Sequence, residues 1–595
     1  TALSTVGGTY YVAQYSYEFN SGSNYSKVID PIDRVFRTDV STDGLTHTSK
    51  TYASQAAYSG GSGTPLKTAT ITYEKDTGLT YISNLRVQNV QITDGSYTRR
   101  TNYTYTTVGG AILPYDVKEY LGDATTVYRY TRTNYNSSTT YINKHILGLP
   151  SEVLVYKGDN TLVAKTTFTY DESGYFDTTS YTVTNHDASN YGTGYIAGRA
   201  NLTTVTQFEV PGSASRAVSH TKFDMLGNTR AAYDGANHVT EYFYDDNFVT
   251  TGNPTTRALV TKVKDPDSYW SGAKYNYHTG QIAQSYHIAG TSGTGSQENI
   301  VTYSYNSVDR LIAVTQPSGH GGQVTRDYWD NWMAVAEYVA IDSGKTRYSF
   351  VAYDGAGQTR WNGSDHPDGT SGKYSIQTFG YDSVGRTKYA SNPTAADGGL
   401  STNYPAWDED YYFGWLYTTI TYDALDRQTV VTRPDDHTVQ YSYTGCGCAG
   451  TSQVTVTDER GKKRKTVYDF LGRLSEAYNL TSASATYAKA VYSYDERDLL
   501  QNIKHYNNGS AYQERTFGYD GYGRLTSQTT PEAGTASYEY WADDTVKKVT
   551  DARSLYAQFT YNNRGLVTVV DYSDSTLDVN YSYGEYGERT LMQEK

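Results

Sequence analysis

Most of the chain alternates between apolar or aromatic residues and small polar residues. The segments TTITYD (418–423), KTVYD (465–469) and YAKAVYSYD (487–495) are examples, and they are rich in β-branched and aromatic side chains. Alternation with a period of two is typical of strands that are buried on one face only. The pattern therefore predicts many short β-strands separated by turns.

A six-residue phrase, written YDxxGR, recurs between these predicted strands. Its Asp can accept hydrogen bonds from backbone amides just ahead of it, and its Gly supplies a positive φ at low steric cost. A new strand begins directly afterwards, so we interpret each copy as the corner of a β-hairpin. The clearest corners contain Tyr353, Asp354, Gly357, Tyr381, Asp382, Gly385, Arg386, Tyr422, Asp423, Arg427, Tyr468, Asp469, Gly472, Arg473, Tyr519, Asp520, Gly523 and Arg524.

The tyrosines that end the predicted strands are regularly spaced. From Tyr422 to Tyr583 the steps are 21, 25, 26, 25, 21, 21 and 22 residues. Such a period is typical of architectures in which each unit stacks on its neighbours. Equivalent tyrosines then share one face of a sheet, with each hydroxyl free to remain in water. The phrase repeats for architecture rather than for catalysis.

The composition favours a β fold and limits the partners. Hydrophobic residues make up 37% of the chain and aromatic residues 14%, with 64 Tyr. Disordered chains are poor in aromatic and β-branched residues, so we predict an all-β solenoid of stacked hairpins. The formal net charge of −13 opposes binding to a phosphate backbone, and no apolar run approaches the ~20 residues of a membrane helix. We expect no nucleic-acid partner and no membrane span.

The repeated phrase and its spacing resemble the YD repeat of the RHS family. That family includes bacterial polymorphic toxins, the C component of insecticidal Tc toxins and the teneurin cell-surface proteins. The resemblance runs from about residue 146 to the C-terminus and is strongest over 353–571. It implies a strand spiral that winds into a hollow shell or tube, which in toxins encloses a C-terminal effector.

One departure from that pattern limits what can be carried over. Toxin shells of the family end in a core segment with paired DPxGL-type motifs, where an aspartyl autoprotease frees the effector. The two Asp-Pro pairs of this chain, Asp30-Pro31 and Asp265-Pro266, lack the Gly-Leu pattern. We therefore assign self-cleavage to no residue, and we expect the effector and any export signal to lie outside this chain.

Two regions differ from the regular repeat. Residues 1–145 are an irregular β region, which we interpret as a cap or the start of the shell, with a separate β-sandwich as the alternative; residues 146–595 form the YD-repeat shell. The 41-residue interval between Tyr381 and Tyr422 holds an aromatic and acidic insertion at 393–416.

That insertion holds the best candidate for a binding surface. Flat aromatic rings beside carboxylates can stack on sugars and accept their hydroxyl hydrogens. The alternative is that these rings pack the insertion onto the shell. The residues are Trp407, Asp408, Asp410, Tyr411, Tyr412 and Trp415.

Catalytic and metal-binding motifs are scarce. The chain's two cysteines, Cys446 and Cys448, exclude a disulfide framework but leave free thiols, a local bridge or half of a zinc site open. The eleven His residues form no HExxH pair, and no GxSxG elbow occurs. We predict no catalytic residue, no cofactor and no metal.

These observations predict a non-enzymatic structural protein that encloses or displays, with an enclosed polypeptide cargo as partner. One alternative is an extracellular fibre subunit or cell-surface adhesin that self-associates through its end strands. Another is a carbohydrate-binding solenoid with glycan partners. We expect a secreted bacterial protein, extracellular or on the cell surface.

Overall fold

The computed structural model describes residues 2–4, 10–12 and 15–595, apart from 79–82, 96, 211, 213, 318, 320, 331–332, 343, 398–413, 451 and 508. Of these described residues, 54% lie in strands and 3% in helices, and 43 of the strands formed by them make one long antiparallel sheet that does not close. β1 and β2 pair separately with each other. The predicted all-β repeat fold is confirmed.

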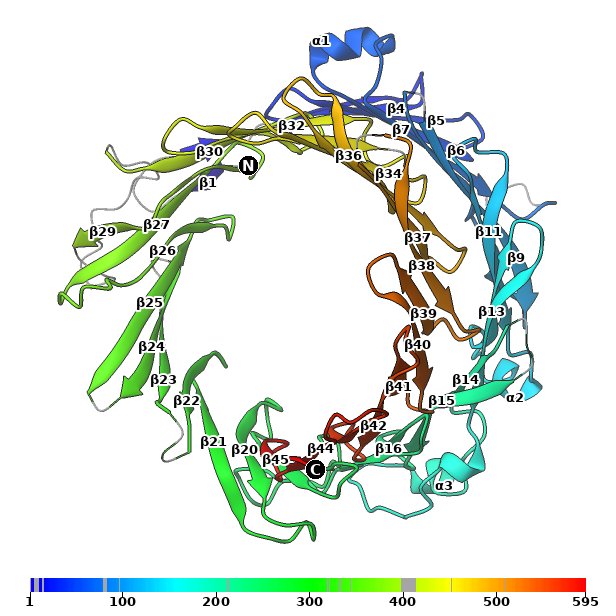
Figure 1. Ribbon diagram of the computed structural model, residues 1–595, viewed down its shortest axis with the longest axis vertical. Helices are drawn as coiled ribbons and strands as arrows, with labels where there is room; N and C mark the ends of the chain where they lie inside the picture. Colours follow the sequence, from blue (N-terminus) through cyan, green and yellow to red (C-terminus); the bar gives the residue numbers. More distant parts are fainter. Residues whose placement is uncertain are drawn as a thin grey trace. The chain divides into compact units, whose positions relative to one another are not determined.

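The first half of the sheet follows the chain in order (Figure 1). Its strands, with the separate pair first, are β1 (Ala2–Ser4), β2 (Tyr10–Val12), β3 (Ser16–Asn20), β4 (Tyr25–Ile29), β5 (Val35–Val40), β6 (Thr46–Tyr52), β7 (Lys67–Glu74), β8 (Arg86–Asp94), β9 (Tyr97–Val108), β10 (Ala111–Tyr120), β11 (Val127–Tyr135), β12 (Pro150–Lys157), β13 (Leu162–Tyr170), β14 (Leu202–Phe208), β15 (Ser215–Phe223), β16 (Thr229–Asp234), β17 (Val239–Phe243), β18 (Lys262–Lys264), β19 (Trp270–Tyr275), β20 (Ile282–Ile288), β21 (Gln297–Tyr305) and β22 (Leu311–Thr315).

The second half continues in the same way. Its strands are β23 (Val324–Trp329), β24 (Ala334–Asp342), β25 (Lys345–Tyr353), β26 (Thr359–Asp365), β27 (Lys373–Tyr381), β28 (Thr387–Ser391), β29 (Thr394–Asp397), β30 (Tyr417–Tyr422), β31 (Gln428–Thr432), β32 (Thr438–Thr444), β33 (Gln453–Thr457), β34 (Lys463–Tyr468), β35 (Leu474–Leu480), β36 (Thr486–Tyr494), β37 (Leu500–Asn507), β38 (Tyr512–Tyr519), β39 (Leu525–Thr530), β40 (Gly534–Tyr540), β41 (Val546–Thr550), β42 (Tyr556–Tyr561), β43 (Val567–Tyr572), β44 (Val579–Tyr583) and β45 (Arg589–Glu594).

The helices are single turns in the connections. They are α1 (Gln55–Tyr58), α2 (Thr139–Ile142) and α3 (Ala188–Tyr191), with 3₁₀ turns η1 (Ser59–Gly61) and η2 (Ser173–Tyr175).

A change of register recurs at the tyrosine of the corner. β34 pairs with β35 residue by residue until Val467, and the pairing then shifts so that Tyr468 faces Leu474. The same shift occurs at Tyr422 and Tyr519. A bulge of this kind bends a strand and increases its twist. Each corner therefore adds local curvature to the sheet.

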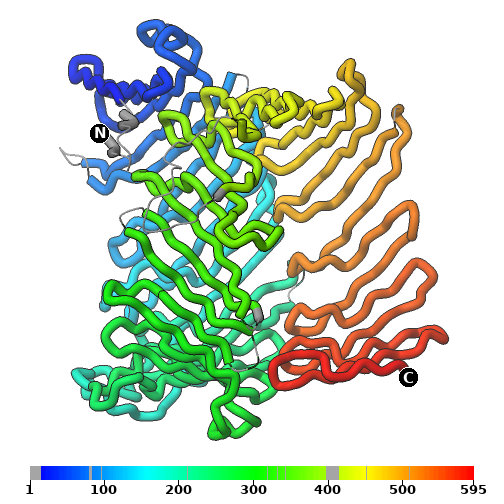
Figure 2. The backbone as a smooth tube through the Cα atoms, turned by 90° about the vertical axis from the view of Figure 1, so that its left-hand side faces the viewer, coloured from blue at the N-terminus to red at the C-terminus, as the bar shows by residue number. Residues whose placement is uncertain are grey.

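The chain divides into two compact units, each built from an early and a late part of the sequence. Unit 1 comprises residues 1–101, 120–125 and 303–490, and unit 2 comprises 102–119, 126–302 and 491–595. In unit 1 we call 1–101 the early run and 303–490 the late run; in unit 2 these are 126–302 and 491–595. Figure 2 traces the late run of unit 2 from orange to red beside its early run.

Unit 1 contains the largest buried cluster among the described residues. Tyr348, Phe350 and Trp361 pack with buried alanines and with Ile376, which is fully buried. Phe350 meets Trp361 edge to face at a ring separation of 5.4 Å, an arrangement that aromatic pairs favour. Aromatic rings thus provide the core that the short supply of aliphatic residues cannot.

The strand pairing can be compared with the domain organisation expected from the sequence. β3 to β8 pair in chain order as part of the long sheet. Whether residues 1–145 are a cap, the start of the shell or a separate β-sandwich stays a prediction. β11 and β12 pair directly across residue 145, and a domain boundary at that residue stays a prediction. β28 pairs with β30, and β29 between them in the sequence pairs with β27. The insertion expected at 393–416 stays a prediction.

Candidate functional site

The YDxxGR corner is a compact hydrogen-bonded turn. At Asp469 the carboxylate Oδ1 accepts from the backbone N–H of Leu471 and of Arg473, both at 2.9 Å. The N–H of Gly472 donates to the carbonyl of Asp469, and Gly472 has a φ of +85°. The predicted roles of Asp and Gly are therefore present in the structure. Positive φ also occurs at Gly357 (+78°), Gly385 (+88°), Asp426 (+64°) and Gly523 (+91°).

The corner tyrosine has a role that the sequence did not reveal. The hydroxyl of Tyr422 donates to the carbonyl of Thr387 at 2.7 Å, so it is tied to the preceding hairpin rather than left to water. Burial raises the pKa of Tyr422, which keeps the hydroxyl protonated as a donor. Equivalent hydrogen bonds to a backbone carbonyl are made by Tyr381, Tyr443, Tyr519, Tyr540, Tyr561 and Tyr583.

The arginine that ends the phrase links two successive corners. Arg386 donates from Nε to Asp382 Oδ2 at 2.7 Å inside its own corner. Its Nη1 donates to Asp426 Oδ1 in the next corner at 2.8 Å, and its guanidinium lies 4.7 Å from the ring centroid of Tyr422. A planar guanidinium can serve both partners at once because its donors point in several directions. Arg524 makes the same pair of contacts with Asp520 and Asp544.

In unit 1 a corner of the late run also binds the early run. Arg34 donates to Asp30 Oδ2 and to Asp426 Oδ1, both at 2.6 Å. Burial opposes the charged guanidinium, but these two carboxylates outweigh burial and raise the pKa of Arg34. Burial alone would raise the pKa of Asp426, but Arg34 and Arg386 lower it. We use the word seam for a junction within one unit at which residues of the late run bind residues of the early run.

Unit 2 has a seam of its own, made of ion pairs and backbone contacts. Arg129 in the early run donates to Asp498 Oδ2 at 2.6 Å and to the carbonyl of Glu496 at 2.9 Å. Ion pairs of the same kind join Arg216 with Asp544 and Asp267 with Arg564, and a hydrogen bond joins His287 with Glu585. Each late-run partner lies in or beside a corner. The corners therefore reverse the chain direction and also hold the two runs together.

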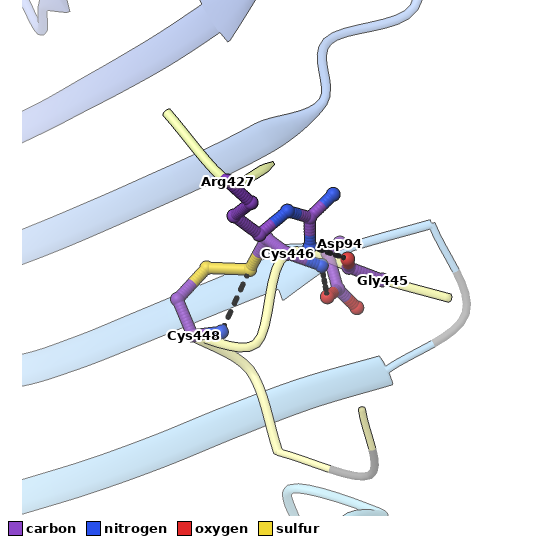
Figure 3. Close-up of a disulfide and its surroundings, with 5 residues drawn as sticks. All are labelled: Asp94, Arg427, Gly445, Cys446 and Cys448. Atoms are coloured by element: carbon purple, nitrogen blue, oxygen red, sulfur yellow. Dashed lines mark hydrogen bonds between the residues drawn. A yellow bond between two sulfur atoms is a disulfide. The ribbon is translucent and has the colours of Figure 1, made fainter. Parts of the chain in front are cut away.

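The two cysteines lie at the seam of unit 1 and form a disulfide (Figure 3). The N–H of Cys446 donates to Asp94 Oδ2 at the end of β8, and Arg427 donates to the carbonyl of Gly445 at 2.6 Å. The sequence left free thiols, a local bridge and a zinc half-site open; the local bridge is the arrangement in the structure.

Asp94 is a buried carboxyl group, only 5% exposed, beside this disulfide. Its Oδ1 accepts no hydrogen bond from the described residues. Burial raises the pKa of Asp94, and the N–H of Cys446 and the charge of Arg427 offset this only in part. The ionised form is therefore less favourable in the folded protein than in the unfolded chain.

This arrangement predicts a specific pH dependence for Asp94→Asn. A carboxyl group with a raised folded pKa contributes stability below its unfolded pKa and loses it as pH rises through the folded pKa. The neutral Asn should therefore help most near pH 7, and its advantage should shrink towards about pH 4, near the unfolded pKa. Urea unfolding of both proteins at the two pH values measures this difference. An advantage that does not change with pH contradicts the assignment.

A pocket of about 530 Å³, lined by both polar and apolar side chains, lies on the face of β23–β27 in unit 1. Cross-strand pairs place Glu337, Ser349 and Ser364 in one row across neighbouring strands. Arg326 and Glu337 form an ion pair at 2.9 Å at one end of this row. Arg326 and Glu337 thus satisfy each other, and we assign no ligand to this pocket.

The aromatic surface expected at 407–415 falls mostly outside the described residues, which include only Trp415 of that set. Trp415 packs against the buried aromatic cluster of unit 1. The other five residues stay a prediction, and the described residue favours the packing alternative.

Comparison with known proteins gives a likeness in structure. No protein-family model and no curated protein sequence matches the chain. The crystal structure of TcdB2-TccC3 without its hypervariable C-terminal region matches 96% of this chain at 10% identity, with a TM-score of 0.67. This chain has the TcdB2-TccC3 fold.

Two further TcdB2-TccC3 structures agree with this. The structure with Cdc42 matches 94% of the chain with a TM-score of 0.63, and TcdB2-TccC3 itself matches 96% with a TM-score of 0.53, both at 10% identity. The chain spans 40%, 41% and 32% of the three structures' lengths. The resemblance to RHS shells, predicted from the YD phrase, is confirmed for the fold.

Proposed function

We propose that this chain is a non-enzymatic, shell-like wall that encloses or displays a polypeptide. The observation that carries the proposal is the TcdB2-TccC3 fold, which covers 96% of the chain. TcdB2-TccC3 has a hypervariable C-terminal region, which that crystal structure was solved without. By analogy, the cargo of this wall is a variable polypeptide encoded with it, and its partners are other proteins of a secreted assembly.

The corner chemistry supports a structural role. A sheet with little aliphatic core needs other links between hairpins, and here the corner Asp, Arg and Tyr supply them through hydrogen bonds and ion pairs. The seams of units 1 and 2 add links between distant parts of the chain. At the corners described above, the repeated Asp, Arg and Tyr side chains are thus engaged in hydrogen bonds or ion pairs within the sheet.

Secretion is part of the proposal. A disulfide persists in oxidising compartments, and Cys446 and Cys448 form one. No helix in the described part of the chain has the length and hydropathy that a membrane-spanning helix needs. We propose an extracellular or cell-surface location on the ground of the disulfide.

Electron microscopy of the full natural protein, purified from its source, tests the proposal. Discrete particles with density for a polypeptide inside them are the expected result. Filaments with a regular axial repeat would contradict enclosure and favour a fibre subunit. A glycan screen of the same sample, with Trp415→Ala as the matched variant, tests the carbohydrate alternative.

A further inference from the structure

Three side chains that can bind a metal ion meet at the seam of unit 2. They are Asp234, His238 and Asp543, and one ligand atom from each lies within 4.8 Å of the other two. His238 Nδ1 is 2.8 Å from Asp234 Oδ2 and 3.8 Å from Asp543 Oδ2. Asp543 belongs to the late run and the other two residues to the early run, so the group joins two distant parts of the chain.

His238 occupies the arginine position of a corner. Asp234 Oδ1 accepts from the N–H of Ala236 and of His238, both at 2.9 Å, as Asp469 Oδ1 does in its corner. At the corners of Asp382 and Asp520 a permanently charged guanidinium reaches a carboxylate of the next corner: Arg386 reaches Asp426 and Arg524 reaches Asp544. A neutral imidazole cannot supply that charge, but it is a good metal ligand.

Asp543 supplies an independent observation. Its side chain is only 8% exposed, and its Oδ1 accepts from the N–H and the hydroxyl of Thr545 at 3.1 and 2.7 Å. Its Oδ2 receives no hydrogen bond from the described residues, and His238 Nδ1 lies 3.8 Å from it. The lone pairs of this carboxylate oxygen are therefore available to a metal ion.

The backbone holds the two corners in fixed register. A Cβ atom on Gly235 would collide with the carbonyl oxygen of Ala542, so the corners pack backbone against backbone. Arg216 also binds Asp544 Oδ2 at 2.9 Å from the adjacent strand β15. The three ligand atoms are therefore presented by a junction that other contacts already fix.

We propose that Asp234, His238 and Asp543 bind a divalent transition-metal ion, with zinc as the representative. The ligands are His238 Nδ1 and one oxygen of each carboxylate, and water completes a tetrahedron. Ligand atoms around zinc are about 3.3 Å apart, since the bonds are about 2.0–2.1 Å. The distances of 2.8 and 3.8 Å lie on either side of that value. An imidazole nitrogen in the set favours zinc over magnesium or calcium.

The ion cross-links the early and late runs of unit 2 at their seam. Because its ligands come from both runs, it binds the folded unit and not the separated runs, and so stabilises the folded form by mass action. This inference does not depend on what the wall encloses, and it goes beyond the proposed function.

The test is a zinc titration of the intact chain, kept free of reductant so that Cys446 and Cys448 stay bonded. After treatment with a chelator, one zinc ion per chain is expected to bind and to raise the melting temperature, whereas magnesium at the same concentration is not. Asp543→Asn and His238→Ala should each weaken zinc binding about tenfold or more.

The matched control is His437→Ala. His437 Nδ1 lies 3.3 Å from Asp435 but has no third ligand within the described residues, so this variant should bind zinc as the parent does. Parental zinc affinity in both ligand variants, or no zinc-dependent stabilisation of the parent, overturns the proposal.

A second measurement covers variants that fail to fold. Hydrogen exchange of the parent with and without zinc should show added protection in 229–243 and in 540–550 together. Protection confined to any other part of the chain also overturns the proposal, because it places the ion elsewhere.

Discussion

Replacing Arg34 by Met is expected to destabilise the early run of unit 1 by about 3–5 kcal/mol, because it leaves a buried carboxylate unpaired. The side chains of Arg34 and Asp30 are only 9% and 3% exposed. Arg34 also reaches Asp426 in the late run, so the substitution removes a link of the seam at the same time. Met keeps an unbranched apolar stem in place of that of Arg, so the effect mainly reports the lost charge and hydrogen bonds.

Hydrogen exchange is the suitable measurement, since long repeat sheets open locally rather than all at once. A loss of about 3 kcal/mol corresponds to exchange on the order of 100-fold faster in Val35–Val40. The control is Arg310→Met, whose ion pair with Asp330 is 35% and 70% exposed and should change exchange little. Equal effects of the two substitutions on hydrogen exchange would falsify the claim that the burial of the Arg34 ion pair makes its loss more destabilising.

The corner was predictable from the sequence because its chemistry is local. Asp469 and Gly472 act within five residues of each other, and propensity for turns is written in such short segments. The hydroxyl of Tyr422 was not predictable in the same way. Its acceptor, the carbonyl of Thr387, lies 35 residues upstream across the expected insertion. A regular period alone does not say which backbone group a side chain meets.

The seams could not be predicted because they join residues far apart in the chain. Arg34 and Asp426 are separated by 392 positions, and Asp94 and Cys446 by 352. No spacing rule connects such residues, since the way that one run lies on another depends on accumulated twist and bulges.

The group around His238 was missed for the same reason, although one signal was available. Its corner reads Tyr-Asp-Gly-Ala-Asn-His, with His where the repeat has Arg. Metal-binding motifs are recognised by ligands that lie close together in the chain, and on that criterion no metal was expected. The replacement of Arg by His at position 238 of the repeat indicated this group better than the search for an HExxH motif did.

The second large effect is expected for Gly450→Ala, at about 2–5 kcal/mol. Gly450 is buried in unit 1 and has a φ of +83°. A Cβ atom there would lie 2.6 Å from the backbone oxygen of Phe470, which belongs to the corner that begins at Tyr468. Left-handed backbone costs alanine about 1–2 kcal/mol, and forced overlap in a packed region costs about 1–3 kcal/mol more.

Gly472→Ala separates these two causes. Gly472 has nearly the same φ, +85°, but no heavy atom lies within 4 Å of the position that its Cβ would take. This variant should lose only the backbone contribution, about 1–2 kcal/mol. Urea unfolding, with hydrogen exchange over β33–β35, compares the two. A larger loss at Gly450 identifies close backbone packing between corners as a source of stability, whereas equal losses would show that the corners owe their glycines to turn geometry alone.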